Sequence, residues 1–350
     1  MRAPVLQVRD LSVHFRVDTG RLFRHEYHTI RAVDRVSFDV HSAETLGIVG
    51  ESGCGKSTLA RALLGLVRPQ GGSVQWLGEE LVGLSEEAMR AKRREIQLIF
   101  QDPSGSLDPR MTVGQIVAEP LRTFYPSMSR LQVRERVQGI MQLVGLSPEQ
   151  INRYPHEFSG GQCQRIGIAR ALVVNPRLVV CDEPVSALDV SIQAQIVNLL
   201  KDLQKKLQLS LIFIAHDLSV VRHVSDRVLV MYLGRVMEVA DRDSIYLKPR
   251  HPYTRALIES VPIPDPVKER ARARRSLEGD MPSPLHPPSG CVFRTRCPYA
   301  TEACAKEVPA LETLDDGNQV ACIRHRELAQ DDRLETEDDA AKHEQEGSSG

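Results

Sequence analysis

The sequence predicts an α/β fold built on a mostly parallel core sheet, followed by a small second segment. Two observations predict the sheet. Residues 178–181 and 211–215 are continuous apolar runs, which are typical of strands buried on both faces of a parallel sheet. A third run at 45–49 leads into a glycine-rich loop and then a helix at 58–66. Such strand–loop–helix units are the repeating element of α/β folds.

Composition limits the possible functions. The chain of 350 residues can hold one large domain and a smaller one, and its net charge is -1. That charge provides no global basic field, so we expect no nucleic-acid partner. No apolar run approaches the roughly 18 residues that span a bilayer, and residues 1–10 lack a secretion signal. We therefore expect a cytoplasmic protein that reaches a membrane only through partners.

The order of elements divides the chain. Residues 5–15 and 33–40 alternate as strands do, and residues 16–32 are expected to form a loop between them. Residues 102–165 carry turns and an amphipathic stretch, which predicts a helical subdomain inside a first domain at 1–240.

Prolines then interrupt the chain, and an extension is expected at 241–330. Residues 331–350 hold eight acidic residues against Arg333 and Lys342, which predicts a disordered acidic tail.

The glycine-rich loop matches the pattern G-x-x-x-x-G-K-S over residues 50–57. Its glycines let successive backbone N–H groups face phosphates, and the following helix adds its positive end. Lys56 is expected to reach the β- and γ-phosphates, and the Ser57 hydroxyl to bind Mg²⁺. The loop therefore predicts binding of a nucleoside triphosphate.

An acidic pair, Asp182 and Glu183, ends the apolar strand at 178–181. Asp182 is expected to hold Mg²⁺, directly or through water. Glu183 is the candidate general base, or the residue that polarises the attacking water. The alternative is that Glu183 is only a solvated residue at a strand end.

Between the loop and this strand lies the sequence Phe-Ser-Gly-Gly-Gln at 158–162. With these motifs in this order, residues 1–240 resemble the nucleotide-binding subunits of ABC transporters. The resemblance implies the ABC type of P-loop NTPase fold, with an antiparallel β subdomain and a helical subdomain beside the parallel sheet. In that family the Ser-Gly-Gly-Gln turn binds the γ-phosphate held by a second, facing subunit.

The resemblance also assigns roles to individual residues. Gln101 contacts Mg²⁺ and relays to the transmembrane partner, Asp189 belongs to a D-loop at the dimer interface, and His216 contacts the γ-phosphate. The implied catalytic residues are Glu183, His216, Lys56 and Gln101, with Ser57, Gln101 and Asp182 at Mg²⁺. The implied ATP-binding residues are Phe15, Gly50, Glu51, Ser52, Gly53, Cys54, Gly55, Lys56, Ser57 and Thr58. The turn that acts on the facing subunit is Ser159, Gly160, Gly161 and Gln162.

Three positions carry alternatives. Phe15 is expected to stack on adenine, although Phe23 and Tyr27 are rivals and Phe15 could be a core aromatic. Cys54 is interpreted as a small spacer rather than a redox switch. Phe158 stands where the family usually has Leu, but the four residues after it are intact.

A further resemblance begins at His251-Pro252-Tyr253-Thr254. This segment and residues 290–298 resemble the C-terminal extension of peptide and nickel importer ATPases. The resemblance implies an ATP-hydrolysing motor for oligopeptides or dipeptides that dimerises with a homologous D-type ATPase subunit. It also implies two transmembrane permease subunits, an extracytoplasmic peptide-binding protein as an indirect partner, and a peripheral place at the cytoplasmic face of the inner membrane.

Two other functions stay open. One is an importer of nickel or another small solute. The other is a non-transport ABC ATPase of DNA repair or translation. Such proteins usually have long coiled coils or two ATPase units, and this sequence has neither.

Four cysteines gather in the extension at spacing C-x5-C-x6-C-x17-C: Cys291, Cys297, Cys304 and Cys322. In a reducing cytosol such a group is more often a metal site than a set of disulfides. Zinc sites usually use closely spaced pairs, because two thiolates must lie about 3.7 Å apart. Loose spacing favours a [4Fe–4S] cluster with one cysteine per iron. Zinc and free thiols are the alternatives.

Overall fold

The computed structural model describes residues 3–18, 20, 27–103, 105–261 and 279–329. The chain forms two compact units, Met1–Arg235 and Val236–Gly350. The predicted acidic tail at 331–350 lies outside the described residues. None of the helices in the described ranges combines the length and the apolar character needed to cross a bilayer.

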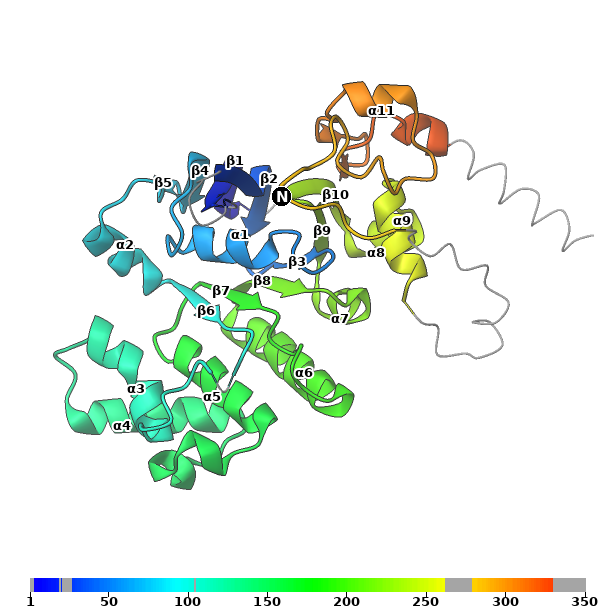
Figure 1. Cartoon of the computed structure of the whole chain (residues 1–350). Helices are drawn as coiled ribbons and strands as arrows, with labels where there is room; N and C mark the ends of the chain where they lie inside the picture. The colour runs from blue at the N-terminus through cyan, green and yellow to red at the C-terminus, as the bar shows by residue number, and fades with distance from the viewer. Residues whose placement is uncertain (1–2, 19, 21–26, 104, 262–278, 330–350) are drawn as a thin grey trace, which may run out of the picture. The chain divides into compact units, whose positions relative to one another are not determined.

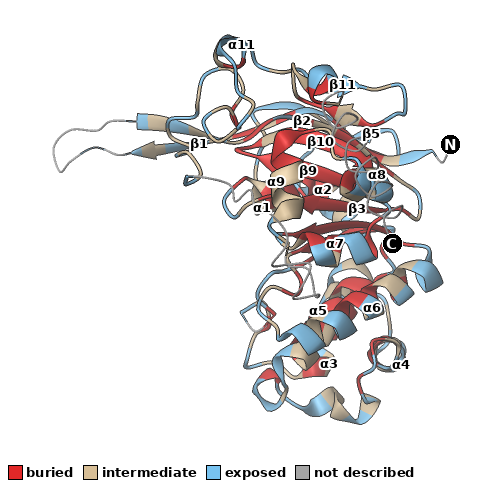
Figure 2. Ribbon diagram, turned by 90° about the vertical axis from the view of Figure 1, so that its right-hand side faces the viewer, coloured by how far each residue is buried: buried red, intermediate tan, exposed pale blue. Residues whose placement is uncertain are grey.

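A parallel sheet forms the core of the first unit (Figure 1). Its strands, in spatial order, are β9 (Arg227–Tyr232), β3 (Thr45–Val49), β8 (Ser210–Ala215), β7 (Leu178–Asp182) and β6 (Ile96–Ile99). Every residue of β3, β7 and β8 is buried, as Figure 2 shows in red. The continuous apolar runs in the sequence therefore correspond to strands covered on both faces, as expected.

An antiparallel sheet forms the second layer of this unit. Its strands are β2 (Tyr27–His41), β1 (Pro4–Asp18), β4 (Gly71–Trp76) and β5 (Glu79–Glu80), in this order. The predicted loop at 16–32 was too long, because the β1–β2 pairing continues to Asp18 opposite Tyr27. The distal part of this pair is largely exposed, so it lacks the alternating apolar pattern by which strands are recognised.

The first unit also contains seven α-helices among the described residues. They are α1 (Lys56–Leu63), α2 (Glu86–Arg93), α3 (Val113–Phe124), α4 (Arg130–Leu143), α5 (Gly160–Leu172), α6 (Val190–Leu207) and α7 (Leu218–Val224). Two short 3₁₀ turns, Pro148–Asn152 and Pro155–Glu157, precede α5.

The helices α3, α4 and α5 pack together as one group (Figure 1). Each begins with a capping box, in which a Ser or Thr and a Gln three residues later exchange side chain–backbone hydrogen bonds. The three caps are Thr112 with Gln115, Ser129 with Gln132, and Ser159 with Gln162. Local sequence therefore fixes where this helical group begins.

The second unit consists of short elements. They are β10 (Arg235–Asp241), α8 (Arg242–Leu247), α9 (Pro252–Glu259), α11 (Glu302–Lys306), β11 (Glu312–Thr313) and β12 (Gln319–Val320). β12 pairs antiparallel with both β10 and β11. The fully buried rings of Tyr253 and Phe293 pack with centroids 5.2 Å apart and form part of its small core.

Candidate functional site

The predicted nucleotide-binding residues gather at one edge of the parallel sheet. In such a sheet the carboxyl ends of neighbouring strands meet at the same edge, where α/β proteins bind ligands. β8 pairs with both β3 and β7, so the segments after these three strands start side by side. Those segments carry the loop at 50–57, Glu183 and His216.

The loop packs directly against neighbouring backbone. Gly55 has φ +106°, and a Cβ added there would lie 2.0 Å from the carbonyl oxygen of Ala32 on β2. A Cβ on Gly50 would lie 2.2 Å from the carbonyl oxygen of Met231 on β9. A side chain at either position would displace the loop, so both glycines are required for this approach.

Lys56 begins α1 and is only 4% exposed. Its Nζ donates to the carbonyl oxygens of Gly50 at 2.7 Å and Glu51 at 3.0 Å. The same nitrogen lies 3.9 Å from Oε1 of Glu183. Two carbonyls and a carboxylate thus compensate the buried ammonium, which needs such partners away from water.

Ser57 and Asp182 form the second polar pair. The Ser57 hydroxyl donates to Oδ1 of Asp182 at 2.8 Å. Burial raises the pKa of Asp182, and the hydrogen bond from Ser57 offsets part of this rise. A hydroxyl and a carboxylate beside a phosphate-binding lysine provide the oxygen ligands that Mg²⁺ prefers.

Glu183 lies at the centre of the predicted catalytic residues. Its Oε2 accepts a hydrogen bond from Nε2 of Gln101 at 3.1 Å and lies 3.5 Å from Nδ1 of His216. Its backbone has φ +46°, and its N–H donates to the carbonyl oxygen of Ile214. This left-handed conformation is costly for a non-glycine residue and is often found at functional sites.

These side chains line one pocket. It is bordered by Ser52, Gln101, Asp102, Glu183, Ser186, Ala187 and His216. The predicted turn at 159–162 is not among the residues that border it. Lys56 lies 3.9 Å from the Glu183 carboxylate of this pocket, and the Ser57–Asp182 hydrogen bond joins the residues next in sequence. Together these groups can position a triphosphate and a water for phosphoryl transfer.

The turn at 159–162 instead begins α5, with Ser159 as its N-cap. A Cβ on Gly161 would lie 2.5 Å from Ile192, so this glycine packs against the first turn of α6. Asp189, the predicted D-loop residue, is the N-cap of α6. Ser159 and Gly160 are exposed. The turn therefore presents the N-terminus of a helix, which favours anions, to the outside of its own chain.

The predicted adenine-stacking residue, Phe15, lies on the antiparallel sheet near the loop. Phe15 is 40% exposed on β1 and pairs with Ile30, two residues before the Ala32 that contacts Gly55. Its predicted rival Tyr27 lies under the guanidinium of Arg16, 3.9 Å from the ring centroid. The other rival, Phe23, lies outside the described residues. Phe15 and Tyr27 are both accessible, at 40% and 53% exposed, but the Tyr27 ring already has Arg16 over it.

Cys54 and Thr58 complete the predicted set. Thr58 lies half-buried in the first turn of α1. The Cys54 sulfur is buried, 3.8 Å from Nζ of Lys56. Burial raises the pKa of the Cys54 thiol, and Lys56 opposes this rise only in part. A thiol held in its protonated form is unreactive, which favours the interpretation of Cys54 as a spacer.

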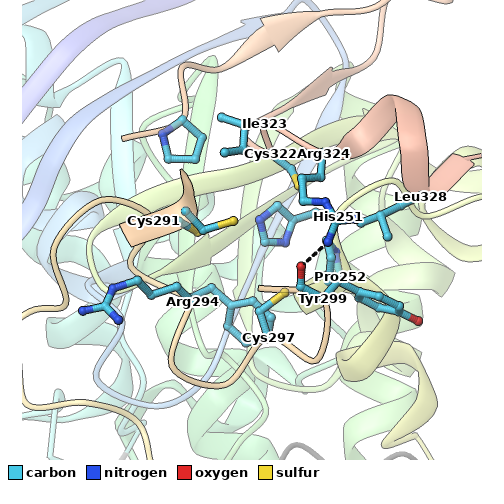
Figure 3. Close-up of a pocket in the computed structure, with 13 residues that line it drawn as sticks. His251, Pro252, Cys291, Arg294, Cys297, Tyr299, Cys322, Ile323, Arg324 and Leu328 are labelled. Carbon is cyan, nitrogen blue, oxygen red and sulfur yellow. Dashed lines mark hydrogen bonds between the residues drawn. The ribbon is translucent and has the colours of Figure 1, made fainter. Parts of the chain in front are cut away.

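The four clustered cysteines line a single pocket in the second unit. Its lining residues include Cys291, Cys297, Cys304 and Cys322 together with His251, Phe293 and Arg324. Figure 3 shows the sulfur atoms of Cys291, Cys297 and Cys322 turned towards the same space. The structure thus brings together cysteines that are separated by up to 31 residues in the sequence.

Burial makes two of these thiols weaker acids than usual. It raises the pKa of Cys297 and of Cys322 to about 11, and the neighbouring cysteines contribute further to the rise. Within the described ranges, no group of three or more His, Cys, Asp or Glu side chains is arranged to hold a metal ion. The predicted iron–sulfur cluster therefore stays a prediction.

Sequence reasoning found no role for His251, which lies in this pocket. Burial lowers its pKa to about 3, so the ring is neutral. No single-residue signal distinguishes it, because its partners Phe293 and Ala321 lie far away in the sequence. His325, only three residues after Cys322, does not line the pocket and instead lies 3.3 Å from Glu312.

Comparison with known proteins identifies the family. Residues 33–186 match the model of the ABC transporter family, and residues 237–304 match that of the oligopeptide/dipeptide transporter C-terminal region. The oligopeptide transport ATP-binding protein OppF of Escherichia coli is 61% identical over 324 residues, covering 92% of this chain and 97% of the relative. The protein of the same name from Haemophilus influenzae is 57% identical, covering 91% and 97%.

Solved structures agree. A dimeric ATP-binding cassette in a post-hydrolysis state with ADP and Pi has a TM-score of 0.61 and 28% identity, covering 68% of this chain and 98% of that one. The cbiO1 protein of Clostridium perfringens, part of an ABC transporter complex, has a TM-score of 0.60 and 26% identity, covering 70% and 91%. The predicted fold class is confirmed. The chain belongs to the ATPases of the ABC transporter family, in the group with the oligopeptide/dipeptide transporter C-terminal region.

Proposed function

We propose that this chain is the ATP-hydrolysing subunit of a membrane importer of oligopeptides or dipeptides. One observation carries the proposal: at one edge of the core sheet Lys56 lies 3.9 Å from Glu183, and Ser57 donates a hydrogen bond to Asp182. The relatives named above are oligopeptide transport ATP-binding proteins, which supports this cargo over nickel or another small solute.

The residues divide the work of hydrolysis. Lys56 binds the β- and γ-phosphates in place of the two loop carbonyls that it now contacts. Ser57 and Asp182 would hold Mg²⁺. When bound, this ion would neutralise part of the phosphate charge. Glu183 polarises the attacking water and takes its proton. Gln101 and His216, both beside the same carboxylate oxygen, orient Glu183 and approach the γ-phosphate.

The proposal includes a second ATPase subunit. Ser159, Gly160, Gly161 and Gln162 do not line the pocket of their own chain, Ser159 and Gly160 are exposed, and a solved relative is dimeric. Each ATP would therefore lie between the loop of one subunit and the turn of the other. We propose that the partner is a homologous D-type subunit, so that the pair is a heterodimer.

The remaining partners follow from transport. Two transmembrane permease subunits would convert closure of the ATPase pair into movement of the cargo, which an extracytoplasmic peptide-binding protein delivers. The chain would then act at the cytoplasmic face of the inner membrane as a peripheral subunit. A non-transport ATPase of DNA repair or translation lacks support, because the C-terminal match is to a transporter region.

For the cysteine pocket we propose a [4Fe–4S] cluster. A cubane takes one cysteine on each of its irons, so its cysteines surround a volume instead of converging on one ion. Four cysteines that line one pocket could provide one thiolate to each iron. The nearby Arg294 and Arg324 suit the negative charge of thiolate ligands. Zinc is the alternative occupant.

The test of the ATPase mechanism is Glu183→Gln in the assembled transporter. The substitution keeps shape and hydrogen bonding but removes the base. ATP affinity should stay within a few-fold of wild type, while kcat should fall about 10²- to 10⁴-fold. Stopped ATP turnover together with ATP-dependent trapping of the subunit pair would support the proposal.

The matched control is Glu87→Gln, the same chemical change at an exposed carboxylate in the first turn of α2. It should leave turnover unchanged. Wild-type turnover by Glu183→Gln would remove Glu183 from the mechanism. Hydrolysis without any transport of peptides would leave the ATPase in place but overturn the proposed cargo.

A further inference from the structure

His251 lines the cysteine pocket, and imidazole is a ligand that both zinc and iron accept. A ligand set of three cysteines and one histidine must therefore be weighed against four cysteines. The hydrogen bonds of the ring decide between them.

Both nitrogens of the His251 ring are engaged by backbone. Nδ1 accepts the N–H of Tyr253 at 3.0 Å, which caps the first turn of α9. Burial lowers the pKa of His251, and a hydrogen bond between the ring and the Ala321 backbone opposes this lowering. Because Nδ1 is the acceptor, the donor to the Ala321 carbonyl is Nε2–H. Neither nitrogen has a lone pair directed into the pocket, so the ring is not arranged as a ligand.

The bond to Ala321 matters because Ala321 directly precedes Cys322. The N–H of Ala321 donates to the carbonyl oxygen of Met237 at 2.8 Å. Its neighbour Val320 pairs with Glu238 between β12 and β10. Both backbone groups of Ala321 are therefore held, and the Cys322 side chain starts from a fixed point.

The other end of this connection is also fixed. Glu238, 1% exposed, accepts the N–H groups of Arg250 at 2.7 Å and His251 at 2.9 Å. The His251 ring packs against the ring of Phe293, with centroids 5.9 Å apart. Phe293 is two residues after Cys291. One side chain thus joins the start of α9, the Cys291 segment and the residue before Cys322.

We propose that His251 is a positioning residue of the cysteine pocket, which fixes Cys322 relative to Cys291 and leaves all ligand positions to the cysteines. This proposal depends on the proposed function only in naming the bound group as an iron–sulfur cluster. The hydrogen bonds that carry it are present without iron, so it can be tested in the metal-free chain.

The first experiment labels the cysteines of the full-length, reduced, metal-free chain with N-ethylmaleimide and follows each site by mass spectrometry. Loss of a buried hydrogen bond makes local opening easier, so His251→Ala should speed labelling of Cys322 about tenfold. His251→Asn keeps a capping oxygen for Tyr253 and should give a smaller increase.

The matched control is His325→Ala, a second buried histidine close to Cys322 that does not line the pocket. In this variant the rate of Cys322 labelling should stay near that of the wild type. Equal labelling of Cys322 in all variants, or an equal increase in His325→Ala, would overturn the positioning role.

The second experiment reads the ring directly. With ¹⁵N-labelled histidine, long-range ¹H–¹⁵N correlations of the metal-free chain should show His251, assigned from its loss in His251→Asn, as the Nε2–H tautomer. A ring with the proton on Nδ1 would contradict the proposed hydrogen bonds.

The third experiment tests the ligand set after reconstitution with iron and sulfide. Pulsed EPR of the reduced protein should show no ¹⁵N coupling from His251. A coupling that disappears in His251→Asn would make the histidine a ligand and overturn the proposal. If the wild-type chain binds no iron, the cluster proposal fails, and the labelling and tautomer results alone decide the role of His251.

Discussion

The nucleotide site and the cysteine pocket are built in opposite ways. At the nucleotide site, functional side chains follow strands of the core sheet and bond to one another, as Ser57 does with Asp182 and Gln101 with Glu183. At the cysteine pocket, backbone bonds between short segments hold the frame. One example is the N–H of Cys291, which donates to the carbonyl oxygen of Cys304 at 2.8 Å.

The two sites therefore differ in whether they need a bound group in order to form. The strands under the nucleotide site are buried throughout, so the core sheet fixes that site whether or not ATP is bound. In the second unit, β11 and β12 have two residues each and α11 has five. Such short elements bury little surface, so a bound metal group would contribute much of their stability.

The two regions nevertheless share one device. Each contains a glycine with positive φ that presses against a carbonyl oxygen. A Cβ on Gly55 would lie 2.0 Å from the Ala32 oxygen, and a Cβ on Gly290 (φ +65°) would lie 2.3 Å from the Cys304 oxygen. Replacing either glycine by alanine is therefore the same chemical change, and it tests how far each site depends on its glycine contact.

The largest effect is expected for Gly55→Ala. The added methyl group must displace the loop from Ala32, and strain and clash together cost about 2 kcal/mol or more. The affinity for ATP, measured by fluorescence titration with a nucleotide analogue, should fall about 30-fold or more. Iron content of the cysteine pocket should not change.

Gly78→Ala is the control for strain alone, since Gly78 has φ +84° but nothing within 4 Å of an added Cβ. It should bind ATP as wild type does. If Gly55→Ala also bound ATP normally, close packing of the loop against β2 would not be what holds the nucleotide site.

Gly290→Ala should have the reverse effect. The methyl group separates Cys291 from the Cys304 backbone, so the anaerobically purified variant should lose most of the about four iron and four sulfide per chain expected of the wild type. Limited proteolysis should cut the second unit several-fold faster, with ATP affinity unchanged.

Gly279→Ala, at φ +78° with open space around it, should keep its metal. Zinc in place of iron in the wild type would replace the cluster with a zinc site. Unchanged metal in Gly290→Ala would show that the Cys291–Cys304 contact does not hold the pocket.

The same contrast explains which parts could be predicted from sequence. The apolar runs at 178–181 and 211–215 are too short for a buried helix, so they favour strands covered on both faces. Motif residues after those strands then meet at one edge as a consequence of parallel pairing. The convergence of Gln101 and His216 on Glu183 is therefore implied by topology.

Backbone contacts leave no such pattern. The carbonyl oxygens of Ala32 and Cys304 could belong to any residue, so nothing in the sequence marks the contacts that require Gly55 and Gly290. His251 is hidden for the same reason, because its partner Ala321 contributes only a carbonyl. The end of the β1–β2 pair was missed because exposed strands carry no burial pattern.

The last prediction concerns pH and changes no residue of the chain. Burial raises the pKa of Cys297 and Cys322 from 9.0 to about 11, which favours the protonated thiol. Since only the thiolate is alkylated, the rate at pH 8 should be about 100-fold below that of N-acetylcysteine, and should keep rising up to about pH 11. Iodoacetamide labelling of the metal-free chain, resolved by site, measures this profile. Rates that level off near pH 9 would mean that water reaches these thiols. The pocket would then be open in the metal-free chain. The bound group would in that case determine the shape of the pocket as well as its stability.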